Sequence, residues 1–148
     1  VAYGDDEPQK STDQTTALLE KYPDLKVICA PTTVGIAAAA KYLQDEKSAC
    51  KLTGLGLPSE MLEYTGADDE HSCPYFYLWD MQGLGKLSAL TTIALINDEI
   101  TGAVDETFTA GDLGDYTITE ADDGGTEVVL GAPLEFNPDN IEEMAKLY

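Results

Sequence analysis

Basic residues are scarce in this 148-residue chain, which has 8 Lys and Arg against 28 Asp and Glu and a formal net charge of -20. A surface of this charge repels phosphate backbones and anionic membranes, so we expect no nucleic-acid partner. No apolar run approaches the roughly 20 residues of a membrane-spanning helix. An initiator methionine and a signal peptide are also absent. The sequence opens directly on strand-like Val1-Ala2-Tyr3, and we expect it to have been cut from something longer.

Cysteine and histidine are too few to define a site. Cys29, Cys50 and Cys73 are odd in number and irregularly spaced, which does not describe a disulfide framework or a zinc knuckle. Cys29 lies within an apolar segment and is expected to be a small core residue, whereas Cys73 lies in a polar loop and could be exposed. His71 is surrounded by acidic residues, and we favour a solvated acidic loop there over a metal site. We therefore expect no cofactor.

Catalytic and nucleotide-binding motifs are missing as well. Gly54-Leu55-Gly56 follows a predicted strand but lacks the third glycine of a dinucleotide fingerprint, so we interpret it as a tight turn. The only histidine has no nucleophile context beside it. The acidic run 120–124 lacks the alternating oxygen ligands of a calcium loop. The sequence thus indicates a protein that is not an enzyme, and a small α/β enzyme is kept as an alternative.

The most informative segment present is KVICAPTTVGIAAAAKYLQ, residues 26–44. An apolar strand runs here into an alanine-rich helix, separated only by Pro31, Thr32 and Thr33. The junction places small polar groups and a helix N-terminus at the carboxyl end of a strand. Open α/β sheets bind their ligands at such positions, so these three residues are candidate ligand-binding residues.

Strands and helices alternate over the first two-thirds of the chain. We predict strands at 1–4, 25–30, 51–55 and 75–79, and helices at 8–22, 35–44 and in a short segment from residue 58. An acidic, turn-rich loop spans 65–74. Short connections between alternating elements imply right-handed crossovers. The predicted fold class is therefore α/β, with a parallel sheet flanked by helices.

The remainder of the chain has a different character. Asp80 is a favourable N-cap for a helix that extends to about Asp98, with Leu84, Leu87, Ala94 and Leu95 near one face that should pack on a core. Turns and short strands follow from residue 100. Segments 116–119 and 127–130 flank a DDGG hairpin signal, and a last short helix is expected over 139–146.

Several of these segments, in this order, resemble a known family. The segments are YGDDEPQKSTDQTTALLEKYPDLK, APTTVGIAAAA, TGLGLPSEM, YLWDMQGLGKLS and LGAPLEFNPDNIEEM. They are similar to the carboxy-terminal half of the type I periplasmic sugar-binding proteins of ABC transporters, in the branch of rhamnose-binding and autoinducer-2-binding receptors. The resemblance implies two α/β lobes joined by three crossing strands. Residues 1–78 would form the carboxy-terminal lobe, and residues 79–148 a crossing segment, helix and tail that partly return to the missing lobe.

The resemblance also implies ligand-binding residues at four places. Pro31, Thr32 and Thr33 would line a cleft between the lobes, and Gly56 would face it from the end of the next strand. Trp79 would stack on a sugar ring, with hinge packing as the alternative. Asp80 would lie beside it, with helix capping as its alternative. Asp6 would fall near another cleft position.

The implied function is that of the solute-binding component of an ABC sugar transporter. Its partners would be a small sugar such as rhamnose and a membrane permease, and it would be periplasmic or extracellular, tethered as a lipoprotein in the full-length form. An autoinducer-2 receptor and the effector-sensing domain of a sugar-responsive transcription regulator are alternatives. Because the other lobe is absent, we expect weak or no sugar binding by this chain alone. Its exposed lobe-contact surfaces could instead pair with a second copy.

Overall fold

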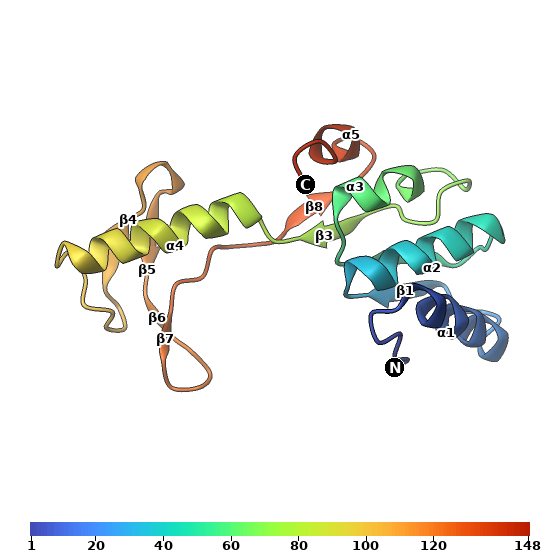
Figure 1. Cartoon of the computed structure of the whole chain (residues 1–148), viewed down its shortest axis with the longest axis horizontal. Helices are drawn as coiled ribbons and strands as arrows, with labels where there is room; N and C mark the ends of the chain where they lie inside the picture. The colour runs from blue at the N-terminus through green and yellow to red at the C-terminus, as the bar shows by residue number, and fades with distance from the viewer. The chain divides into compact units, whose positions relative to one another are not determined.

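Two parallel strands, β1 (Val27–Ala30) and β2 (Lys51–Gly54), form the centre of the first part of the chain in the computed structural model, which describes all 148 residues (Figure 1). Val27 lies opposite Lys51 and Ala30 opposite Gly54. Helix α2 (Thr33–Asp45) connects the two strands, as the alternation of apolar strand and helix predicts. The predicted α/β fold with a parallel sheet is therefore confirmed.

The chain divides into two units, each with its own hydrophobic core. The first consists of Val1–Leu78 and Leu134–Tyr148, and the second of Trp79–Pro133. Besides β1, α2 and β2, the first unit contains α1 (Pro8–Lys21), α3 (Pro58–Met61), the 3-10 turn η1 (Leu62–Tyr64), β3 (Phe76–Leu78), β8 (Leu134–Phe136) and α5 (Ile141–Met144). The second contains α4 (Met81–Ile96), β4 (Thr107–Thr109), the 3-10 turn η2 (Gly111–Leu113), β5 (Asp115–Thr117), β6 (Thr119–Glu120) and β7 (Thr126–Glu127).

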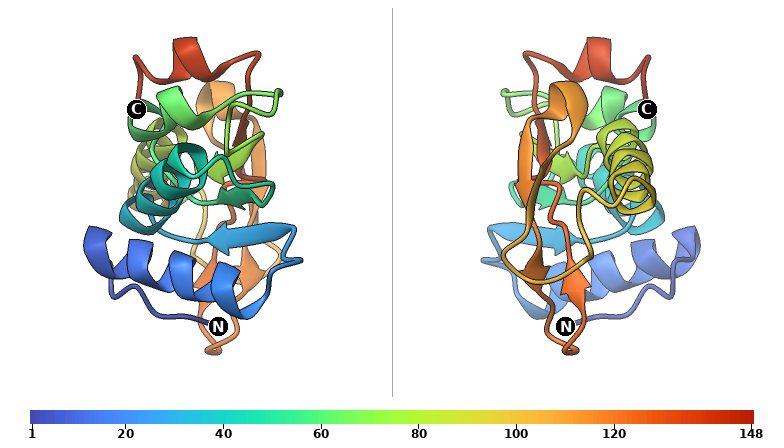
Figure 2. Two further views of the ribbon diagram at one scale, coloured as in Figure 1. Left: turned by 90° about the vertical axis from the view of Figure 1, so that its right-hand side faces the viewer. Right: turned by 90° about the vertical axis from the view of Figure 1, so that its left-hand side faces the viewer.

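Helices α1 and α2 lie side by side in the first unit (Figure 2). Pro8 occupies the first turn of α1, where a missing N–H costs nothing, and the helix ends at Lys21, two residues before Pro23. Helix α2 begins at the Thr32 cap and buries Ile36, Ala39, Ala40 and Leu43.

The core of the first unit is built around two aromatic rings from strands far apart in the sequence. Strands β3 and β8 pair antiparallel, with Phe76 opposite Phe136, and the two ring centroids are 5.1 Å apart. Both rings are fully buried, together with Leu52 and Met61. The carboxy-terminal residues 134–148 therefore pack with residues 1–78.

The core of the second unit forms between α4 and short antiparallel strands (Figure 2). Leu87 and Ala94 of α4 are buried there with Phe108 and Ile118. These two residues belong to the helix face that was predicted to pack on a core. Leu84 and Leu95 remain exposed, because the short strands do not reach across the whole face. None of the helices in the chain has both the length and the apolar character needed to span a membrane.

The strand predicted at residues 1–4 is wrong. A strand depends on backbone pairing with a neighbour, and no strand of this chain pairs with Val1–Gly4. The segment instead runs into a turn, in which the N–H of Glu7 donates to the carbonyl of Gly4 at 3.0 Å. Asp5 and Asp6 occupy the left-handed region of this turn, with φ of 50° and 57°.

Two of the cysteine predictions are also wrong. Cys29 is exposed, because the face of β1 that carries Val27 and Cys29 is not covered by any helix of the chain, whereas Ile28 and Ala30 face the core. Cys73, by contrast, is fully buried, since the loop that carries it folds back so that its N–H donates to the carbonyl of Tyr64 at 3.0 Å. Burial raises the pKa of the Cys73 thiol to about 12.

The hairpin around the DDGG segment exists but is shorter than predicted. Strands β6 and β7 pair over two residues each, with Thr119 opposite Glu127. The preceding strand β5 pairs instead with β4, which the sequence does not single out, because a three-residue Thr-Phe-Thr segment is too short to establish a periodicity.

Candidate ligand-binding site

A cavity of about 770 Å³ lies in the first unit, at the carboxyl end of β1 and along this strand. Its polar end is formed by Asp6, Pro31 and Thr32, three of the residues singled out from the sequence. The remaining wall comes from the amino-terminal segment, from α1, from β1 itself and from α2; it includes Tyr3, Gly4, Ser11, Gln14, Thr15, Leu18, Val27, Cys29, Gly35 and Ala39. The structure thus brings residues 25 positions apart in the sequence to one site.

The junction of β1 and α2 shapes the polar end of this cavity. Thr32 has an extended backbone (φ -140°, ψ 150°), and its hydroxyl accepts the N–H of Gly35 at 3.0 Å. The cap satisfies one N–H of the first helical turn and fixes the direction in which α2 leaves the strand. Pro31 and Thr32 are exposed, and Thr33 is the first residue of α2. The hydroxyl hydrogen of Thr32 can still be donated to a ligand.

The opposite side of the polar end is the turn at Asp5 and Asp6. Asp5 forms an ion pair with Lys10, which holds the turn against α1. Asp6 is exposed and lines the cavity. A carboxylate accepts hydrogen bonds through two oxygens. Asp6 can therefore bind two neighbouring hydroxyl groups of a ligand, and Thr32 can bind a third hydroxyl group of the same ligand.

Gly56 has a different place. It follows β2, is buried, and donates its N–H to the carbonyl of Tyr77 at 3.1 Å. A Cβ at this position would lie 2.8 Å from Ile36 Cγ2 and 3.3 Å from Met61 Cγ, so a larger residue would push the end of β2 away from the core. Gly56 does not line the cavity that contains Asp6 and Thr32.

Trp79 and Asp80 begin the second unit. The residue Trp79 is 46% exposed, so part of its surface is accessible to a ligand. Asp80 caps α4, since its Oδ1 accepts the N–H of Gln82 at 3.1 Å and that of Gly83 at 3.0 Å. The capping role that the sequence offered as an alternative for Asp80 is present in the structure.

Two polar residues of the cavity wall were missed at the sequence level. Ser11 and Thr15 are buried in α1, where the Thr15 hydroxyl donates to the carbonyl of Ser11 at 2.8 Å. Their spacing of four residues places them on one helix face. Small hydroxyl residues at this spacing on a buried face were the available signal, but in α1 they alternate with exposed polar residues and do not stand out.

The loop around His71 does not form a metal centre. Nowhere in the chain do three or more His, Cys, Asp or Glu side chains gather in an arrangement that could hold a metal ion. His71 Nδ1 lies 2.7 Å from Asp68 Oδ1, and this hydrogen bond lowers the pKa of the Asp68 carboxyl. Lys51 donates to the carbonyl of His71 at 2.9 Å, which ties the loop to β2.

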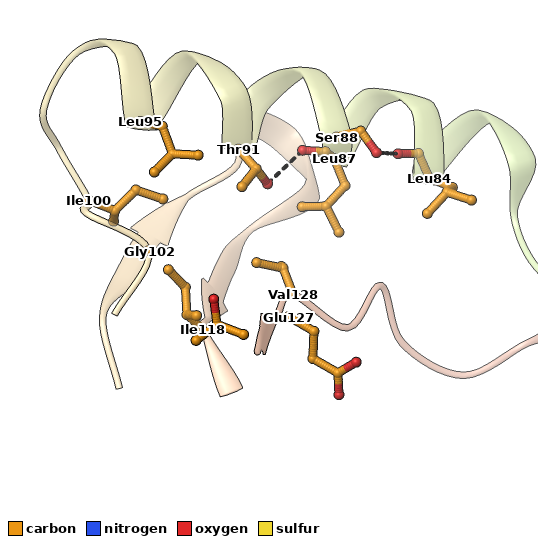
Figure 3. A pocket seen from close by; sticks show the side chains of 11 residues that line it. Leu84, Leu87, Ser88, Thr91, Leu95, Ile100, Gly102, Ile118, Glu127 and Val128 are labelled. Atoms are coloured by element: carbon orange, nitrogen blue, oxygen red, sulfur yellow. Dashed lines mark hydrogen bonds between the residues drawn. The ribbon is translucent and has the colours of Figure 1, made fainter. Parts of the chain in front are cut away.

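A second cavity, of about 300 Å³, lies in the second unit beneath α4 (Figure 3). Leu84, Leu87, Ile100 and Val128 project into it. The helix hydroxyls nearby are already used, since Ser88 donates to the Leu84 carbonyl and Thr91 to the Leu87 carbonyl, both at 2.8 Å. Glu127 and Thr126 also line this cavity, and none of the residues predicted to bind a ligand does.

The parallel pair and its connecting helix define an α/β fold, with a candidate binding cavity at the carboxyl end of β1. Residues 1–100 match the family described as "Periplasmic binding protein domain", and the chain belongs to this family. No curated protein matches the chain.

Solved structures give closer relatives. An ABC transporter solute-binding protein from Clostridium phytofermentas with bound L-rhamnose is 59% identical, with a TM-score of 0.83 over 99% of this chain and 48% of that chain. A sugar ABC transporter protein from Actinomyces odontolyticus is 45% identical, with a TM-score of 0.82 over 95% of this chain and 44% of that one. LsrB from Clostridium saccharobutylicum in complex with AI-2 is 17% identical, with a TM-score of 0.71 over 95% and 46%, and shows the fold alone.

The chain spans about half the length of these relatives. The resemblance inferred from the sequence motifs, to the sugar-binding proteins of ABC transporters, is confirmed. The relative with bound L-rhamnose is described as an ABC transporter solute-binding protein, which agrees with the expectation that the chain is not an enzyme.

Proposed function

We propose that this chain supplies one wall of the sugar-binding cleft of an ABC transporter's solute-binding protein, with L-rhamnose as the ligand class. The observation that carries the proposal is the convergence of Asp6, Pro31 and Thr32 on one cavity at the carboxyl end of β1, in a chain 59% identical to a protein with bound L-rhamnose. A neutral sugar has hydroxyls that donate and accept, and a carboxylate and a threonine hydroxyl match both roles.

Trp79 and Asp80 belong to the proposal as ligand-binding residues of the full-length protein, and they lie in the second unit. An exposed indole is suited to the apolar face of a sugar ring. Thr33 and Gly56 support the site through the backbone, Thr33 at the start of α2 and Gly56 by letting β2 end close to the core. In the full-length protein a second lobe would supply the opposite wall, and closure of the lobes would remove the ligand from water.

The proposed partners are the sugar and a membrane permease that receives it. The proposed location is the periplasm or the cell exterior, with a lipoprotein tether in the full-length form. An autoinducer-2 receptor stays an alternative, but the similarity to LsrB is a similarity of fold and does not indicate which ligand this chain binds. An effector-sensing domain of a regulator would need a DNA-binding part, and the chain itself has a net charge of -20, which disfavours DNA.

The proposal is tested by titrating the labelled chain with L-rhamnose and following backbone amide NMR signals. We expect weak binding, on the order of millimolar, because one wall of the cleft contributes only part of the contacts. The affected amides should be those of Asp6, Thr32 and Thr33. A micromolar affinity measured by calorimetry would contradict the expectation that the second lobe is needed.

A matched pair of variants makes the titration specific. Asp6→Ala removes the carboxylate from the cavity, and Asp24→Ala removes another exposed carboxylate that does not line it. We expect Asp6→Ala to abolish the rhamnose-dependent shifts and Asp24→Ala to leave them unchanged. Shifts that persist in Asp6→Ala, or that cluster away from the β1–α2 junction, would refute the site.

A further inference from the structure

The turn that carries Asp6 has an unfavourable backbone. Five non-glycine residues of the chain have positive φ, and only Asp5 and Asp6 among them are adjacent in the sequence. Their φ values of 50° and 57° lie in the left-handed region, which costs free energy even though aspartate tolerates it better than most side chains. Two such residues in succession must be held in place by the surrounding structure.

The carboxylate of Asp6 does not hold this conformation itself. Asp6 lines the large cavity but forms no hydrogen bond or ion pair within the chain. The direction of its carboxylate is therefore set by the backbone of the turn. Relaxation of Asp5 or Asp6 to negative φ would redirect this carboxylate relative to Thr32, which lies at the same polar end of the cavity.

One side chain of α1 acts directly on the strained residues. Lys10, the third residue of the helix, reaches back and forms its ion pair with Asp5. The other close contact of the turn with the helix, between Gly4 and Ser11, precedes the two strained residues. Lys10 is also the only basic side chain within residues 1–20, so no other cation of this segment can take its place.

The ion pair and the backbone strain are comparable in size. The side chains of Lys10 and Asp5 are 42% and 57% exposed, and an exposed ion pair changes an equilibrium by roughly fivefold at most. A residue held in the left-handed region carries a cost of the same order. Loss of the ion pair should therefore shift the conformation of the turn by a measurable amount.

We propose that Lys10 is a positioning residue for the ligand, because through Asp5 it keeps Asp6 directed at the polar end of the cavity. Salt screens an exposed ion pair, so the affinity of this site for a neutral sugar should depend on ionic strength, although the sugar itself has no charge to screen. The ligand part of this proposal rests on the proposed function. The conformation of the turn can be measured without sugar.

The first measurement is made on the labelled chain without sugar. A positive φ brings the amide hydrogen of a residue close to its own Hα, so Asp5 and Asp6 should each give a strong intraresidue NOE. We expect Lys10→Met to weaken both NOEs and Lys10→Arg to retain them. Lys41→Met is the matched control, because it removes one positive charge from another exposed ion pair, that with Asp45, and should leave both NOEs unchanged.

The second measurement is an L-rhamnose titration of the same variants at low salt. We expect Lys10→Met to weaken binding by about threefold, and Lys10→Arg and Lys41→Met by less than about 1.5-fold. Asp5→Asn breaks the ion pair from its other end and should have the same effect as Lys10→Met. The double variant should lose no more affinity than either single variant, because both remove one interaction.

The third measurement repeats the titration at different salt concentrations. Between about 10 mM and about 1 M NaCl the Debye length falls from about 30 Å to about 3 Å. The rhamnose affinity of the unchanged chain should fall by about threefold over this range. The affinity of Lys10→Met should stay constant, because the ion pair that salt screens is already absent.

Unchanged NOEs in both Lys10→Met and Asp5→Asn would overturn the proposal even if rhamnose binds as expected. Weakened NOEs with an unchanged rhamnose affinity would also overturn it, as would the same salt dependence in the unchanged chain and in Lys10→Met. Failure of the unchanged chain to bind L-rhamnose would refute the proposed function and the ligand part of this proposal together. The NOEs would then still decide whether Lys10 positions Asp6, and circular dichroism identifies any variant that has lost the fold.

Discussion

Asp80 Oδ1 accepts the backbone N–H of Gly83 at 3.0 Å, and a Cβ on Gly83 would lie 2.5 Å from Asp80 Oδ2. The carboxylate can therefore lie over the first turn of α4 because the residue beneath it has no side chain. The pair fixes where the second unit begins its only long helix.

Asp80→Ala should lower the free energy of unfolding of the second unit by about 1 kcal/mol, because two N–H groups of α4 lose their acceptor. Asp80→Asn keeps an oxygen acceptor and should lose much less. Thermal unfolding followed by circular dichroism measures the difference, which corresponds to roughly 4–8 °C for a unit of this size. Equal losses in both variants would mean that the charge of Asp80, rather than its capping oxygen, matters.

Two glycines should respond in opposite directions to alanine. Gly54 ends β2 with φ 148°, and a Cβ there would collide with the carbonyl oxygen of Ala30, so Gly54→Ala should cost about 3 kcal/mol or more. Gly85 lies inside α4 with nothing within 4 Å of the added Cβ, and Gly85→Ala should stabilise by about 0.5–1 kcal/mol. Chemical denaturation of both variants beside the unchanged chain provides the comparison. A neutral Gly54→Ala would show that the close approach of β1 and β2 is not required.

The three thiols should differ sharply in reactivity. Cys29 is exposed, whereas Cys50 and Cys73 are buried, and burial raises the pKa of both thiols. Ellman's reagent at pH 8 should therefore detect one fast thiol in the folded chain and all three Cys residues of the sequence in guanidinium chloride. Cys29→Ser is the control and should show no fast thiol. Any fast thiol in that variant would contradict the burial of Cys50 or Cys73.

Glu106 should make the second unit sensitive to acid. Its Oε2 accepts the backbone N–H groups of Thr101, Gly102 and Ala103 at 2.7, 2.9 and 3.1 Å. These bonds favour the ionised form, first among them that from Thr101, and lower the pKa of Glu106 below the usual 4.5. A lowered pKa in the folded state gives stability that is present above about pH 4.5 and is lost as the pH falls through the folded value.

Glu106→Gln tests this dependence. The variant should be less stable than the unchanged chain at pH 7, and the difference should shrink as the pH falls below about 4.5. Urea unfolding followed by the fluorescence of Trp79, the single tryptophan, measures it across this range. If the stability difference between the variant and the unchanged chain did not vary with pH, the ionisation of Glu106 would not be its cause.

The elements that the sequence predicts well are those whose local signals agree with their packing. Asp80 was predicted as an N-cap and begins α4, and the helix predicted from residue 35 exists but starts two residues earlier, after the Thr32 cap. Pro8 marks the first turn of α1 as expected. Of the residues predicted for the site, Asp6, Pro31 and Thr32 line one cavity, and their role in ligand binding stays a prediction.

The failures have a common physical reason. A continuous apolar strand predicts burial on both faces, but Val27 and Cys29 are exposed because no helix of the chain covers their face of β1. Residues 1–4 have strand-like composition but no partner to pair with. The composition of a segment predicts whether it is suited to be buried or paired, but not which part of the polypeptide covers it. The relative with bound L-rhamnose is about twice as long as this chain, so it contains polypeptide that residues 1–148 do not include.

Helix α4 carries one charged residue, Lys86, in 16 positions, and Ile93 and Ile96 project from it into solvent. The chain has 28 acidic residues, so two copies repel each other at neutral pH. This repulsion, rather than polar residues on α4 itself, keeps the exposed isoleucines of two copies from associating. That repulsion vanishes near the isoelectric point of about 4.1, whereas the apolar surface of α4 stays exposed. The solubility of this protein should therefore depend on pH and salt. We expect it to aggregate in acidic buffers and to stay in solution at low salt near neutral pH.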